Sequence, residues 1–121
     1  MLILHRREGE AVFSGFNLDS DNLEGTFDHH VVVKEVGHQE WAKYVELHIT
    51  TPNGETQELT LTPGVNSARI TPDLELIFLG TREYMVSGGP AEVSARIGYE
   101  APRSYRIVRD NARKNMGRAA V

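Results

Sequence analysis

Hydrophobic and polar residues alternate along much of the chain, and this pattern predicts β-strands. Within 43–62 the apolar side chains Val45, Leu47 and Ile49 fall on one face of an extended segment, and polar residues fall on the other. A Pro-Asn-Gly turn signal at 52–54 divides this region into two strand-like runs. The pattern therefore predicts a β-hairpin over 43–62.

Shorter apolar or β-branched runs predict strands elsewhere. These runs lie at 1–4, 11–13, 29–36, 70–79, 81–85, 93–98 and 104–108. The run 70–79 begins with a Pro72-Asp73 turn and continues as the strand LELIFL. We expect Gly9 to adopt a positive φ in a turn, Gly80 to end a strand, and the segment 16–28 to form a loop. Asp110 is a suitable N-cap for a C-terminal helix over 111–119. The chain is thus predicted to be mainly β with one short helix.

The charges of the 121-residue chain are unevenly distributed around a net value of −4. Residues 16–69 have three basic and nine acidic side chains, whereas residues 70–121 have eight basic and six acidic side chains. The length predicts one domain, or a small domain that carries a sizeable insert. The acidity therefore belongs to the middle of the chain, and the last part is locally basic.

The composition and motifs also disfavour several classes of protein. Cysteine is absent, which excludes disulfides and thiolate metal sites and fits a reducing cytoplasm. No apolar run has the length of a membrane span. His29 and His30 are adjacent on a predicted strand, so they point to opposite faces and do not chelate one ion together. No nucleophile motif or carboxylate pair indicates an enzyme. We expect a cytoplasmic, non-catalytic protein without a metal or cofactor.

Three segments carry a resemblance to a known family. The chain begins MLILHRREGE, continues with ITPDLELIFLG at 70–80, and ends its basic part with ARIGYEAPRSYRIVRDN at 95–111. Together, in this order, they resemble the carbon-storage-regulator family (CsrA/RsmA). The resemblance covers about half of the chain. Residues 1–15 plus 70–121 would form the CsrA-like RNA-binding module, and 16–69 would be an acidic, hairpin-containing insert without a counterpart.

The resemblance implies a fold and a function. The implied fold is an intertwined homodimer with five strands and a short C-terminal helix from each chain, to which the β-rich insert is added. Each RNA site would combine the first strand of one chain with the last strand of the other. The implied function is that of a bacterial or phage regulator. A regulator of this family would recognise GGA in RNA hairpin loops and occlude the ribosome, and it would thereby repress translation or alter mRNA stability.

The matching positions give the candidate RNA-binding residues, with Arg109 as the central contact. They are Leu4, Arg6, Arg7, Ala101, Pro102, Arg103, Ser104, Arg106, Ile107 and Arg109. Arginine suits this chemistry because its planar guanidinium contacts phosphates and guanine edges, and splayed RNA loops expose those edges. The chain departs from the family at three positions. His5 stands where a threonine or similar small polar residue is usual, and Val108 stands where many members have histidine. Ala112 stands where a larger aliphatic residue is usual.

Alternatives concern the insert and the meaning of the resemblance. The insert is expected to shield the RNA site, to compete with RNA, or to point away and bind a protein partner. A second hypothesis is a CsrA-like dimer that has lost or masked RNA binding and acts as a protein-interaction module. A third is a structural β protein whose resemblance is accidental. Neither DNA nor a membrane is an expected partner.

Overall fold

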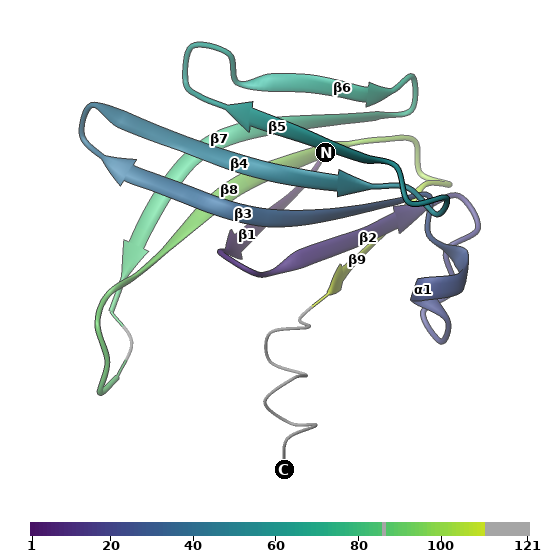
Figure 1. Ribbon diagram of the computed structural model, residues 1–121, viewed down its shortest axis with the longest axis horizontal. Helices are drawn as coiled ribbons and strands as arrows, with labels where there is room; N and C mark the ends of the chain where they lie inside the picture. Colours follow the sequence, from purple (N-terminus) through teal and green to yellow (C-terminus); the bar gives the residue numbers. More distant parts are fainter. Residues whose placement is uncertain (86, 111–121) are drawn as a thin grey trace.

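The computed structural model describes residues 1–85 and 87–110, and these residues form two antiparallel sheets (Figure 1). The elements are β1 (Leu2–Arg7), β2 (Ala11–Gly15), α1 (Leu23–Thr26), β3 (His29–Gln39), β4 (Ala42–Thr50), β5 (Thr56–Leu61), β6 (Ser67–Thr71), β7 (Leu74–Tyr84), β8 (Glu92–Glu100) and β9 (Arg106–Asp110). The first sheet has the order β1-β8-β7-β6, and the second has the order β5-β4-β3-β2-β9. The mainly-β prediction is confirmed, while the predicted helix over 111–119 lies outside the described residues.

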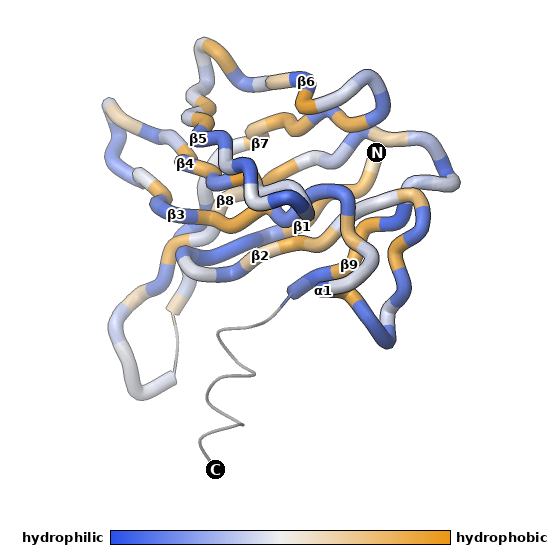
Figure 2. Tube along the Cα trace, turned by 45° about the vertical axis from the view of Figure 1, so that its right-hand side comes forward, coloured by the Kyte–Doolittle hydropathy of each residue, from blue (hydrophilic) through white to orange (hydrophobic). Residues whose placement is uncertain are grey.

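Each sheet turns one apolar face toward the other, as the alternating sequence predicts. Along β4, Val45, Leu47 and Ile49 are no more than 2% exposed, and the residues between them are half-buried. Figure 2 shows hydrophobic and hydrophilic positions interleaved along the strands. The predicted hairpin is confirmed, because β4 pairs with β5 up to Thr50 opposite Thr56.

The acidic region 16–69 is built into the same core as the rest of the chain. Its strands β3, β4 and β5 form most of the second sheet, which β2 and β9 complete. Val33, Leu47 and Leu61 from this region belong to one buried cluster with Leu4 and Leu76 from the first sheet. Among the described residues, the acidic region supplies six of the fifteen side chains of this buried cluster.

The structure corrects the prediction that Gly80 ends a strand. β7 continues through this residue to Tyr84, and its pairing with β8 shifts at a bulge between Phe78 and Thr81. Gly80 has φ +110°, a conformation that glycine adopts without a steric penalty, so the residue bends the strand instead of stopping it. The predicted short strand at 81–85 is the far end of β7.

One further boundary differs from the sequence prediction, because the expected loop 16–28 contains the short helix α1. The predicted turn at Pro72-Asp73 is confirmed, since it separates the end of β6 from the start of β7. A Pro-Asp pair favours a tight local turn of this kind. No helix in the part of the chain that the structure describes is long and apolar enough to cross a membrane.

The chain crosses between the sheets at three connections, 8–10, 62–66 and 101–105. These crossings leave β1 at the edge of the first sheet and β9 at the edge of the second. Both strands begin near the 101–105 connection, since Met1 lies beside Glu100 and β9 follows this connection directly. Both strands end near the corner Arg7–Glu10, since β1 ends at Arg7 and Asp110 pairs with Ala11. The edge strands β1 and β9 thus lie on the same open side of the sandwich.

Because the two sheets share one core, loss of a core side chain from β5 should weaken the whole molecule. Leu61 is 0% exposed. We expect Leu61→Ala to lower the free energy of unfolding by about 3 kcal/mol in a single cooperative transition, measured by urea titration with circular dichroism. The exposed Val65→Ala should change it by less than about 0.5 kcal/mol. Two separate transitions would show that 16–69 folds independently.

Candidate nucleic-acid interface

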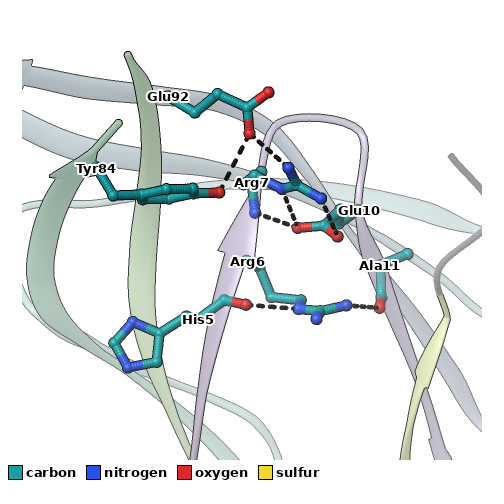
Figure 3. A network of polar contacts seen from close by, with 7 residues as sticks. All are labelled: His5, Arg6, Arg7, Glu10, Ala11, Tyr84 and Glu92. Carbon is teal, nitrogen blue, oxygen red and sulfur yellow. Dashed lines mark hydrogen bonds and ion pairs between the residues drawn. The ribbon is translucent and has the colours of Figure 1, made fainter. Parts of the chain in front are cut away.

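Arg6 and Arg7 are consecutive on β1 and therefore point to opposite faces of the first sheet. Arg6 points inward and is only 6% exposed. Its Nε donates to the carbonyl of His5 at 2.8 Å, and its Nη1 donates to the carbonyl of Ala11 at 3.4 Å (Figure 3). Burial lowers the pKa of Arg6, Glu10 opposes this effect, and the nearby charge of Arg109 lowers the pKa further.

Arg7 sits at the corner between the two sheets and is held by two carboxylates. Its backbone N–H donates to Glu10 Oε1 at 2.8 Å, and its Nε donates to the same oxygen at 3.2 Å. Its Nη1 donates to Glu92, which also accepts from the Tyr84 hydroxyl (Figure 3). The hydrogen bonds that Arg7 donates, first to Glu10 and then to Glu92, raise the pKa of Arg7. Most of the Arg7 charge is therefore balanced inside the chain.

Glu10 is the buried member of this corner, with 3% of its surface exposed. Burial alone would raise the pKa of its carboxyl group, but hydrogen bonds from Arg7 and the charges of Arg6 and Arg7 outweigh burial and hold the pKa below its ordinary value. Gly9, at φ +84°, makes the tight turn that brings Glu10 back to Arg7, as the sequence predicts. These contacts favour the ionised form of the Glu10 carboxyl group.

The outer face of the first sheet gathers basic side chains around His5. His5 lies opposite Arg96, and Ser94 lies between Arg7 and Arg82 in the three-strand register. Directly paired residues share a face, so these side chains lie together. Burial, Arg96, Arg82 and Arg109, in that order, lower the pKa of His5. The concave surface here encloses about 530 Å³ and is lined by His5, Arg6, Arg7, Glu10, Arg82, Tyr84 and Ser94.

Arg109 approaches the same place from the other sheet. It is exposed and pairs with Val12 of β2, so it lies on the core-facing side of the edge strand β9. Among residues 1–85 and 87–110, neither Arg109, Arg82 nor Arg96 has a carboxylate within ion-pair distance. Arg109 at the β9 edge, and Arg82 and Arg96 on the outer face of β7 and β8, thus present guanidinium groups that no described carboxylate balances.

Other candidate residues from the sequence are placed less favourably. Leu4 is buried in the core, and Ile107 packs against it. The connection from Ala101 to Ser104 lies at the opposite end of β9 from Arg109; Ala101 is half-buried, whereas Pro102, Arg103 and Ser104 are exposed. Arg106 is tied to the 16–22 loop, because it donates to the Leu18 carbonyl at 2.6 Å and to the Ser20 hydroxyl at 2.9 Å. The structure therefore joins Arg6, Arg7 and Arg109, and separates them from the 101–106 segment.

The sequence interpretation missed some members of this cluster. Arg82 and Tyr84 were not candidates, and His5 was noted only as a departure from the family. The signal that identifies them is the strand register, since His5, Arg82 and Arg96 come together only when β7, β8 and β1 are correctly aligned. Val108, the second departure, lies opposite Phe13 on the other face of β9, and Ala112 lies outside the described residues.

The corner should be a major determinant of stability. Gln at position 10 would keep the shape of the side chain but remove the charge that Arg7 contacts. We expect Glu10→Gln to lower the free energy of unfolding by about 2 kcal/mol near neutral pH. The exposed Glu55→Gln should change it by less than about 0.5 kcal/mol.

The same residue gives a pH dependence with a definite sign. Because the folded-state pKa of Glu10 lies below the ordinary value of 4.5, its contribution is present above pH 4.5 and is lost as the pH falls through the folded-state pKa. Urea titrations across this range should show a smaller loss for Glu10→Gln than for the unmodified protein. Equal losses would contradict the assigned role of Glu10.

Comparison with known proteins adds no family to these observations. A scan against protein-family models found no match, and searches of the curated proteins and of the solved structures found none either.

Proposed function

We propose that the protein is a cytoplasmic RNA-binding regulator that holds single-stranded, GGA-containing hairpin loops on the edges of β1 and β9. The observation that carries the proposal is the convergence of Arg109 with Arg6 and His5, which are about a hundred positions away in the sequence. The proposed action is steric, by occlusion of the ribosome or by altered message stability, and it includes no chemical step.

The basic side chains are suited to phosphate contacts. Arg82, Arg96 and Arg109 have no acidic partner among the described residues, so binding RNA would not require them to break an ion pair. A phosphate near His5 would offset the repulsion from these arginines and raise the pKa that they depress. The outer pocket therefore fits a segment of RNA backbone better than it fits an apolar ligand.

Base reading would come from the strand edges. β1 pairs only with β8, and β9 pairs only with β2, so each strand has a second edge whose N–H and C=O groups have no strand partner among the described residues. Such groups have fixed spacing and can discriminate base edges in an unpaired loop. In this proposal, Arg109 at the β9 edge would contact RNA that lies against both strands.

The proposed RNA site lies within one chain and does not need a second copy to complete it. The family resemblance implies a homodimer in which each site joins strands from two chains. Here β1 and β9 of one chain lie on the same open side of the sandwich, so the proposed site is complete in one copy. A dimer would then carry two such sites.

The position of the acidic region also supports the proposal. Glu46 and Glu58 lie on β4 and β5, which are separated from β9 by β3 and β2. Their side chains lie on the outer face of the second sheet, because the alternate residues Leu47 and Ile49 face the core. These carboxylates are therefore directed away from Arg109 and do not shield it.

Removal of the central arginine tests the proposed site. We expect Arg109→Ala to weaken binding of a GGA-loop hairpin about tenfold in a gel-shift titration, because Arg109 would contact the RNA directly. The slope of log affinity against log salt should fall by about 0.7 if one phosphate contact is lost.

Arg69→Ala is the matched control, since Arg69 is exposed on β6, pairs across the strands with β7 and forms an ion pair with Glu75. It should bind as the unmodified chain does. Absence of RNA binding at moderate salt, or equal binding by Arg109→Ala, would rule out the proposal.

A second candidate function is supported by the state of Arg7. Its guanidinium is held by Glu10 and Glu92, and Arg6 is mostly buried. Because these arginines are already held within the chain, a second hypothesis is that RNA binding is masked. In that case the surface of the acidic region would contact a protein partner.

Removal of the Glu92 carboxylate from Arg7 distinguishes the RNA-binding function from the masked, protein-binding function. If the corner masks RNA binding, Glu92→Gln should free the outer end of Arg7 and increase affinity for the GGA hairpin about three- to tenfold, on the order of one charge-assisted contact. Glu83→Gln, an exposed substitution on β7, is the control. If the unmodified protein already binds and Glu92→Gln has no effect, the masking hypothesis is wrong.

A further inference from the structure

A second cluster of polar side chains lies on the outer face of the β4–β5 hairpin, away from the basic edge. His48 lies directly opposite Glu58 across the two strands, and Glu46 is two residues before His48 on the same face of β4. The three potential ligand atoms of this cluster, one histidine nitrogen and two carboxylate oxygens, all lie within 4.8 Å of one another.

The separations match those of ligands around one small cation. His48 Nε2 is 3.6 Å from Glu46 Oε1 and 3.4 Å from Glu58 Oε1. Around tetrahedral zinc with bonds near 2.0–2.2 Å, neighbouring ligand atoms are about 3.4 Å apart. The three side chains would therefore need only small rotations to coordinate one ion, because the strand register already aligns them.

His48 Nε2 provides an independent reason to expect a ligand. This atom is shielded from solvent and has no hydrogen-bond partner among the described residues, although a buried polar atom without a partner is costly. It faces two carboxylates, and carboxylate oxygens accept hydrogen bonds, so they do not satisfy the Nε2 lone pair of an imidazole that has its proton on Nδ1. A cation placed between the three atoms would satisfy the nitrogen lone pair and both negative charges together.

We propose that Glu46, His48 and Glu58 bind a divalent transition-metal ion, with zinc as the best fit. An imidazole nitrogen with two carboxylates suits zinc, whereas calcium and magnesium prefer ligand sets made entirely of oxygen. Three protein ligands leave a fourth position for water or for a group from a partner. This site does not depend on the proposed RNA-binding function, since it uses other residues on the other sheet.

The test uses the full chain, stripped with a chelator and titrated with zinc chloride by calorimetry. We expect one zinc ion per chain with a dissociation constant in the micromolar range, and a higher thermal midpoint when zinc is present. His48→Gln and Glu58→Gln should each weaken zinc binding at least about tenfold, because each removes one ligand. Far-UV circular dichroism checks that both variants are folded. Glu58 is mostly exposed, so its variant remains informative if His48→Gln fails to fold.

Two control variants outside the cluster test whether zinc binding is specific to Glu46, His48 and Glu58. Glu55→Gln removes an exposed carboxylate just before β5. His38→Gln removes a histidine whose one ion-pair partner in the described part of the chain is Glu83, at 3.7 Å. Both should bind zinc as the unmodified chain does. The proposal is wrong if the unmodified chain binds no zinc at micromolar concentration, if His48→Gln or Glu58→Gln binds it equally well, or if either control loses it. In those cases His48 forms only an ion pair, or the zinc ligands lie elsewhere.

Discussion

The corner Arg7–Glu10 is the constraint on which the arrangement of the two sheets depends. The chain leaves the first sheet at Arg7 and enters the second at Ala11, and the buried Glu10 carboxylate bonds both the backbone and the side chain of Arg7 across this short connection. An ionised group this deeply buried is tolerated only when its partners satisfy it. The corner fixes the angle at which β1 meets β2, and therefore the distance between β1 and the edge strand β9.

Much of the strand content could be predicted from the sequence because each sheet has one face in the core. The alternation in β4, the hairpin turn before β5 and the positive φ of Gly9 all follow from local chemistry. The continuation of β7 through Gly80 could not be predicted in this way, because a glycine that ends a strand and one that bends it have the same local signal. Pairing with β8 on both sides of the bulge decides between them.

The candidate site was only partly predictable, for a related reason. Family resemblance identified Arg6, Arg7 and Arg109, but it says nothing about the partners that each side chain finds in this chain. Alternation along β1 sends Arg6 inward and Arg7 outward, and Glu92 from β8 then binds Arg7. His5, Arg82 and Arg96 join the site through cross-strand register, which is a property of the folded sheet. The same register unites Glu46, His48 and Glu58 on the opposite side, so the sandwich has a basic outer face and an acidic outer face.

The pairing of β1 with β8 and of β2 with β9 has a consequence for synthesis. Leu2 pairs with Tyr99 and Val12 with Arg109, so the first strands of the chain have their partners among the last described residues. Contacts of such large sequence separation form late, because loop closure must come before them. A growing chain therefore cannot assemble the β1–β9 side until residues beyond 100 have left the ribosome. If this side binds RNA, a regulator of this design becomes active toward messages, including its own, only after its translation has passed that point.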